Sequence, residues 1–113
     1  MQLLYLAENG SVRIDITNEI ISEIMRVLRE DFAWEGYRLH FMRLWLLKIA
    51  NLVSPTLMLR VVDDPDDDRI LECAIEAGSD FIVTNDNDLL RLKEYSGIKI
   101  VRANNFLRDE MGR

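Results

Sequence analysis

The hydrophobic residues in the first third of the chain first alternate and then recur at helical spacing, which predicts a strand followed by a helix. Val12, Ile14 and Ile16 alternate with polar residues, and this is the period of a half-buried strand. Either Thr17 or Asn18 can begin the helix, since both side chains accept hydrogen bonds from first-turn amides. The apolar stripe of this helix consists of Ile20, Ile21, Ile24, Val27 and Leu28.

Two further apolar segments of the first half also predict helices. A long helix is expected from about Trp34 to Asn51. Because apolar residues occupy more than one side of it, this helix lies either wholly within the core or partly against another subunit. Met1–Glu8 is rich in leucine and is followed by Asn9-Gly10, a helix-ending signal, so a helix is expected there as well.

The second half of the chain alternates short apolar runs with amphipathic segments, as α/β proteins do. Strands are expected at Leu57–Val62, Phe81–Thr84 and Ile98–Val101. Helices are expected from the aspartates at 64–68 to Gly78, from about Asp86 through Leu90, and over Ala103–Met111. These elements predict an α/β fold with three α/β/α layers and a mostly parallel sheet. Sites in such sheets form beyond the carboxyl ends of the strands, here after Val62 and after Thr84.

Length, composition and charge narrow the class of protein. A chain of 113 residues with 49% hydrophobic residues fits a single soluble domain over residues 1–113. No apolar stretch is long enough to span a bilayer, and the single cysteine, Cys73, leaves no disulfide framework, so a cytoplasmic protein without membrane contact is expected. The net charge of −6 argues against nucleic-acid binding by a broad basic surface, but not against an enzyme that meets phosphate through bound metal.

Acidic residues gather in three places that the predicted elements bring toward one end of the sheet. Glu23 lies at the edge of an apolar stripe, where a carboxylate needs water, an arginine or a metal ion. The run Asp64-Pro65-Asp66-Asp67-Asp68 opens a helix, and a helix cap needs only one of its carboxylates. Asp86 and Asp88 follow the most strand-like segment, where Asp86 can also serve as a helix cap. Each group alone has a structural explanation.

Taken together, these carboxylates predict a site for a hard divalent cation. Mg²⁺ and Mn²⁺ prefer oxygen ligands, and carboxylates supply both oxygen and charge. Such ions generate hydroxide from bound water and stabilise charge on a phosphodiester during an in-line displacement. No Ser-His-Asp or Cys-His constellation competes, because the only histidine, His40, lies in the long apolar helix. The residues therefore predict metal-dependent hydrolysis of a phosphodiester.

The order of these segments resembles the PIN-domain family, and within it the branch of toxin-like proteins from toxin–antitoxin systems. Asp64–Leu71 resembles that branch's aspartate-proline-x-aspartate helix start. Ala77–Thr84, with the acidic residues and leucines that follow it, is similar to the signature ADYIVTGDKDLL. Thr17–Ile24 resembles the segment that carries the family glutamate, and Ala103–Leu107 resembles the closing TPAEFL. The resemblance covers nearly the whole chain.

By position within this resemblance, the metal-binding and catalytic residues are Glu23, Asp67, Asp86 and Asp88. Asp68 is an alternative metal ligand beside Asp67, because the acidic run allows a shift of one residue, and Thr84 matches a supporting hydroxyl. The resemblance implies cleavage of RNA that depends on Mg²⁺ or Mn²⁺. It also implies a homo-oligomer, frequently a homodimer, and inhibition by an antitoxin protein.

One departure from the family pattern leaves two functional hypotheses open. Family members begin with a central strand that ends in aspartate-threonine-asparagine and carries a primary metal ligand, and no such segment precedes Met1. An N-terminally truncated PIN-like fold with two unpaired inner strand edges is therefore expected. The chain is either a toxin-like ribonuclease or a catalytically impaired PIN-like remnant that acts as an oligomerising or partner-binding module. Val61-Val62-Asp63-Asp64 also resembles response-regulator receivers, but too little chain follows for that fold.

Overall fold

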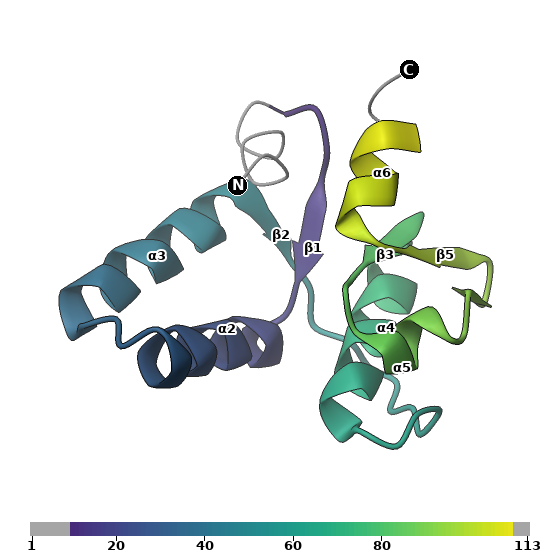
Figure 1. Cartoon of the computed structure of the whole chain (residues 1–113), viewed down its shortest axis with the longest axis horizontal. Helices are drawn as coiled ribbons and strands as arrows, with labels where there is room; N and C mark the ends of the chain where they lie inside the picture. Colours follow the sequence, from purple (N-terminus) through teal and green to yellow (C-terminus); the bar gives the residue numbers. More distant parts are fainter. Residues whose placement is uncertain (1–9, 110–113) are drawn as a thin grey trace. The chain divides into compact units, whose positions relative to one another are not determined.

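The computed structural model describes residues 10–109 and divides into an N-terminal unit, Met1–Ser54, and a C-terminal unit, Pro55–Arg113. Each unit has its own hydrophobic core and is a small α/β structure in itself (Figure 1). The helix predicted for Met1–Glu8 lies outside the described residues.

The N-terminal unit combines two helices with a pair of parallel strands. Strand β1 (Ile14–Ile16) pairs with β2 (Ala50–Leu52). Helices α2 (Asn18–Asp31) and α3 (Gly36–Ile49) connect these strands and pack against each other. The core of this unit is formed by Ile16, Ile21, Met25 and Leu46.

Thr17 fixes the start of α2. Its side-chain oxygen accepts a hydrogen bond from the backbone N–H of Ile20 at 3.0 Å, and the residue is almost fully buried. A buried cap of this kind satisfies one of the amides that a helix start leaves without a partner. The helix then turns its predicted stripe inward, because Ile21 is buried and Ile24 packs partly against the core. The predicted strand, cap and amphipathic helix are confirmed.

The long helix is shorter than the sequence predicted. It ends at Ile49, and Ala50–Leu52 forms the strand β2 instead of a further helical turn. A short apolar run fits a helix and a buried strand equally well, so periodicity alone could not place this boundary. Pairing with β1 decides it, because β1 has no other strand neighbour among the described residues.

The C-terminal unit contains a three-stranded sheet with the order β3-β5-β4. Strand β3 (Phe81–Val83) runs parallel to β5 (Ile98–Val101), and the short β4 (Glu94–Tyr95) pairs antiparallel with β5. Ser96 and Gly97, with φ of 53° and 82°, form the tight turn between β4 and β5. The helices of this unit are α4 (Pro65–Ala77), α5 (Asn87–Leu90) and α6 (Ala103–Asp109).

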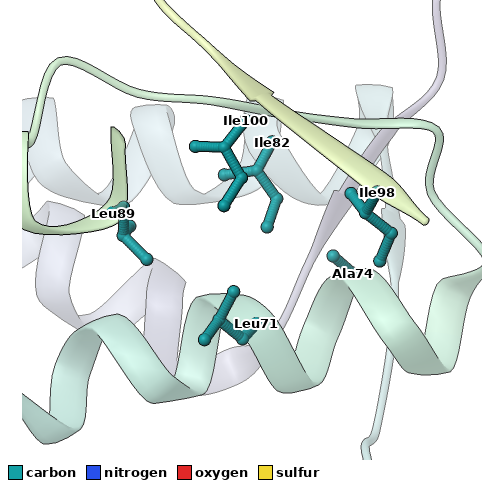
Figure 2. Packing of buried hydrophobic residues seen from close by; sticks show 6 residues of the cluster. All are labelled: Leu71, Ala74, Ile82, Leu89, Ile98 and Ile100. Carbon is teal, nitrogen blue, oxygen red and sulfur yellow. The ribbon is translucent and has the colours of Figure 1, made fainter. Parts of the chain in front are cut away.

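Strand β3 is covered on both faces, which gives the C-terminal unit three layers. Successive side chains of a strand point to opposite faces. Ile82 packs with Leu71 and Ala74 of α4, whereas the ring of Phe81 meets that of Phe106 on α6 with the centroids 5.2 Å apart. The main core consists of Leu71, Ala74, Ile82, Leu89, Ile98 and Ile100 (Figure 2). The predicted α/β fold with parallel strands is confirmed.

The strand predicted over Leu57–Val62 is wrong, and α4 supplies the physical reason. Three carboxylates that lie one helical turn apart on α4 accept hydrogen bonds from the backbone amides of this segment. The pairs are Thr56 with Glu76, Leu59 with Glu72, and Val61 and Val62 with Asp68, at 2.7–3.0 Å. These carboxylates accept hydrogen bonds that the carbonyl groups of a neighbouring strand would otherwise accept. The segment is therefore assigned to no sheet.

Two smaller features of the sequence are found where they were expected. Gly78 ends α4 in the left-handed conformation, with φ of 67°. Cys73 lies buried within α4. Over residues 10–109, no helix combines the length and the apolar character needed to cross a bilayer.

Candidate metal centre

Three carboxylates of the C-terminal unit converge beyond the carboxyl end of β3. They belong to Asp67 in the first turn of α4, Asp86 at the N-cap of α5, and Asp88 in the first turn of α5. One oxygen from each lies within 4.8 Å of the other two. This spacing suits oxygen ligands that surround one hard cation.

The residues before Asp67 fix its place in the first turn of α4. Asp64 is the N-cap, and its carboxylate accepts a hydrogen bond from the backbone N–H of Asp66 at 2.9 Å. Pro65 occupies the first helical position, where a missing N–H leaves no bond unmade. Because Asp64 already caps the helix, Asp67 is not needed for that purpose, yet it is buried with only 7% of its surface exposed.

Short local hydrogen bonds hold Asp86 and Asp88 in place. The backbone N–H of Thr84 donates to the carbonyl of Val101 at 3.0 Å and so extends the pairing of β3 with β5. The Thr84 hydroxyl accepts from the N–H of Asp86 at 3.0 Å, and the Asp86 carboxylate accepts from the N–H of Asp88 at the same distance. These turns end the strand and start α5. They place both aspartates at the start of α5.

Asp67 has the most perturbed electrostatic environment of the three. Burial raises its pKa to about 7, helped by the hydrogen bond and charge of Asp86 and by the charges of Asp64 and Asp88. Its Oδ2 atom is buried and has no hydrogen-bond partner in the part of the chain that the structure describes. A buried carboxylate oxygen without a donor is costly unless it is protonated or bound to a cation. The site therefore fits a divalent cation.

The neighbouring Asp68 has the opposite environment. Its Oδ1 atom accepts the backbone N–H of Val61 at 2.9 Å and that of Val62 at 3.0 Å. These two bonds, led by the one from Val62, lower the pKa of Asp68. Asp68 is not a member of the converging group found among residues 10–109. The structure gives it a part in holding the segment before α4, and a role for Asp68 as a metal ligand stays a prediction.

Asp88 lies at the open side of the cluster. Half of its side chain is exposed, and its Oδ1 atom forms an ion pair with Arg91 at 2.8 Å. Such an exposed pair contributes at most about 1 kcal/mol, so a cation can readily replace it. The sequence prediction did not include this pair, although the i, i+3 spacing of an aspartate and an arginine on a helix is a usable signal for it.

Glu23, the fourth predicted ligand, belongs to α2 in the N-terminal unit. Its carboxylate is paired with Arg26, which also pairs with Glu30 at 2.8 Å. The hydrogen bond from Arg26 lowers the pKa of Glu23. An arginine partner is the structural explanation that the sequence left open for this residue, and a metal-binding role for Glu23 stays a prediction.

One further contact at the loop after β3 could not be found in the sequence. Arg102 follows β5, and its guanidinium donates to the Asn87 side-chain oxygen at 3.0 Å. The two residues are 15 positions apart in the chain and share no motif. They meet because β3 and β5 are parallel, with Val83 opposite Val101. The residues that follow the two strands therefore lie at the same edge of the sheet.

Comparison with protein families gives a match to the PIN domain over residues 1–88. This region contains every acidic residue proposed for the site and ends before Arg102. Comparisons with curated proteins and with solved structures give no match.

Proposed function

The chain belongs to the PIN-domain family, and on this basis we propose that it is a metal-dependent endoribonuclease that hydrolyses RNA phosphodiester bonds. The observation that carries the proposal is the buried Oδ2 atom of Asp67, which lacks a hydrogen-bond donor and lies in one cluster with the carboxylates of Asp86 and Asp88. Burial and the charges of its neighbours disfavour ionisation of Asp67, so a bound cation would stabilise this carboxylate.

The proposed cation is Mg²⁺ or Mn²⁺, held by Asp67, Asp86 and Asp88. Both ions are hard and prefer carboxylate oxygens. When bound, such an ion lowers the pKa of a water molecule and stabilises charge on a phosphodiester. Glu23 is proposed as an additional ligand because it matches the family glutamate; Arg26 would then lose its ion pair with Glu23 and keep the one with Glu30.

The chain's own residues have separate parts in this proposal. Asp67 holds a proton up to about pH 7, and it must release this proton before it can act as a ligand. Thr84 binds the amide of Asp86 and so fixes the loop that presents the other two carboxylates. Asp68 fastens the preceding segment to α4 through two backbone amides, which keeps the first turn of that helix in place.

The biological setting is proposed from the sequence resemblance. We infer a toxin-like cytoplasmic ribonuclease that is inhibited by an antitoxin protein and works as a homo-oligomer. Signature segments on both sides of the cluster support this: the aspartate-proline start of α4, and the strand β3 with the Asp86 and Asp88 loop behind it.

A second candidate function, a partner-binding module without catalysis, is favoured by one surface of α3. Four large apolar side chains on this helix are exposed and recur at i, i+4, i+7 and i+10, which places them on one face. They are Tyr37, Phe41, Leu44 and Leu47. An exposed apolar stripe of this kind is typical of a surface that another protein covers. A module of this sort would bind its partner but would neither bind Mn²⁺ at the aspartates nor cleave RNA.

Cleavage of RNA distinguishes the two candidates. We expect purified wild-type protein to cleave an end-labelled single-stranded RNA in Mn²⁺ or Mg²⁺ and not in EDTA. Asp86→Asn should lower kcat/KM by at least about a hundredfold. Loss of a residue that only hydrogen-bonds to a metal ligand can already reduce activity by about this factor, and loss of the ligand itself should cost at least as much. Asparagine is as good an N-cap as aspartate, so α5 should be preserved.

Asp66→Asn is the matched control for this experiment. Asp66 is exposed in the same acidic region and lies outside the converging cluster, and its replacement removes the same charge as Asp86→Asn does. The Asp66→Asn variant should cleave RNA at the wild-type rate. A wild type that binds Mn²⁺ but leaves every RNA intact, or equal losses in the two variants, would refute the ribonuclease proposal.

A further inference from the structure

We infer that Arg102 binds a phosphate of the RNA at the metal centre, an inference that rests on the proposed ribonuclease function. Arg102 lies beyond residues 1–88, which match the PIN domain, so the family match assigns it no role. Its position, its hydrogen bonding and the charge of its surroundings each support the inference.

The backbone of Arg102 is fixed at the edge of the sheet where the carboxylates gather. The residue lies between β5 and α6, and its carbonyl accepts the N–H of Phe106 at 2.9 Å, which ties it to the first turn of the helix. One position earlier, the carbonyl of Val101 accepts the N–H of Thr84 at 3.0 Å. Arg102 therefore leaves the sheet beside the strand end that leads to Asp86.

The side chain of Arg102 is oriented without being neutralised. It is exposed, and its guanidinium donates to the amide oxygen of Asn87, the residue between Asp86 and Asp88. An amide carries no charge, and a guanidinium has five N–H donors, so most of the donors and the whole positive charge stay available. Among residues 10–109, the ion pairs within 4.0 Å do not include Arg102, whereas Arg91 pairs with Asp88.

The charge of the site creates a need for such a residue. Three carboxylates repel an RNA phosphate, and one divalent ion offsets only two of their charges. The chain as a whole carries a net charge of −6, so no broad basic surface assists. A planar guanidinium held at the loop of Asn87 can take a phosphate through two parallel hydrogen bonds.

The test measures kcat and KM for Mn²⁺-dependent cleavage of a single-stranded RNA over a series of KCl concentrations. The variants are Arg102→Gln, Arg102→Lys and the control Arg108→Gln, which removes the same charge from α6 at an arginine paired with Asp109. We expect Arg102→Gln to lower kcat/KM about tenfold, mainly through KM, as loss of one charged hydrogen-bond partner does. The slope of log kcat/KM against log salt should become shallower by about 0.7, the value for one phosphate of a single strand.

Two further measurements separate substrate binding from a purely structural role. Arg102→Lys should restore the salt slope, and Mn²⁺ affinity should be the same in all variants, because the carboxylates are intact. Asn87→Ala removes the anchor but keeps the charge, so it should raise KM several-fold without changing the slope. This variant also keeps the inference testable if Arg102→Gln does not fold.

The outcomes distinguish failure of this inference from failure of the proposed function. If the wild type cleaves RNA and Arg102→Gln has the KM and salt slope of Arg108→Gln, the role of Arg102 is refuted and the ribonuclease proposal stands. If the wild type binds no Mn²⁺ and cleaves no RNA, both are refuted. A loss of Mn²⁺ affinity in Arg102→Gln with an unchanged salt slope would mean that Arg102 only supports the loop.

Discussion

Replacing Asp67 with asparagine should make the metal-free protein more stable at neutral and alkaline pH. The substitution keeps the shape of the side chain and removes a charge that burial and Asp86 disfavour. The folded protein holds the Asp67 proton up to about pH 7, whereas the ordinary pKa, which applies to the unfolded chain, is 3.8. Ionisation of Asp67 therefore opposes folding increasingly as the pH rises from about 4 to 7, and the full penalty is present above that range.

The magnitude follows from the separation of these two pKa values. Each pH unit of separation corresponds to about 1.4 kcal/mol, which sets an upper limit of about 4 kcal/mol for the gain in free energy of unfolding. Asp88, one source of the repulsion, is half exposed, and screening by solvent reduces the expected gain to about 2 kcal/mol at pH 8. Near pH 4 the gain should fall to a small part of that value, because Asp67 is protonated in the folded protein and, at a pH close to the ordinary pKa of 3.8, is also partly protonated in the unfolded chain.

Urea unfolding in EDTA at pH 4.5 and pH 8, followed by far-ultraviolet circular dichroism, measures this effect. Tryptophan fluorescence is not a suitable probe, because Trp34 and Trp45 both lie in the N-terminal unit, whereas Asp67 lies in the C-terminal unit. Asp68→Asn is the matched control, and we expect it to lower the free energy of unfolding at pH 8. The carboxylate of Asp68 accepts two backbone amides and has a lowered pKa, so its stabilising contribution is present at neutral pH and is lost as the pH falls.

The refuting result is specific. If Asp67→Asn destabilises the metal-free protein at pH 8, or changes its stability equally at both pH values, the burial and repulsion assigned to Asp67 are wrong. If Asp67→Asn and Asp68→Asn behave alike, the structure has not distinguished the two neighbouring aspartates correctly.

Two other predictions concern the site and the fold. Because Asp67 must lose its proton to bind a cation, Mn²⁺ affinity measured by isothermal titration calorimetry should rise about tenfold from pH 6 to pH 8, and a constant affinity would exclude Asp67 as a ligand. Gly78→Ala should cost about 1 kcal/mol, because Gly78 has φ of 67° at the end of α4. Gly36→Ala, in the first turn of α3 with nothing within 4 Å of the added carbon, should be neutral or slightly stabilising, and equal Tm changes in the two variants would contradict this.

The parts of the fold that depend on local signals could be predicted from the sequence. Thr17 as a cap, Gly78 as a helix end and Ile98–Val101 as a strand rest on the chemistry of neighbouring residues. The parts that depend on distant partners could not. Ala50–Leu52 became a strand because β1 pairs with it, and Leu57–Val62 did not because carboxylates of α4 take its amides.

The same distinction applies to the candidate metal centre. The sequence placed the two aspartate-rich segments at one edge of a parallel sheet, and its resemblance to the PIN domain selected Asp67, Asp86 and Asp88 from them. These three carboxylates do lie together, although the strand expected before Asp67 is absent from the described residues. The sequence could not separate Asp67 from Asp68, because both lie in the first turn of one helix. Their different burial and hydrogen-bond partners separate them in the structure. The contact of Arg102 with the loop depends on strand register, which no local pattern reveals.

Binding of Mn²⁺ to purified wild-type protein, compared with Asp86→Asn and Asp66→Asn by isothermal titration calorimetry at pH 8, tests the central claim most directly. The converging carboxylates predict that the wild type and Asp66→Asn bind the ion with equal affinity, and that Asp86→Asn binds it at least about tenfold more weakly while remaining folded. Absence of Mn²⁺ binding by the wild type, or one common affinity in all three proteins, would contradict a metal centre at Asp67, Asp86 and Asp88.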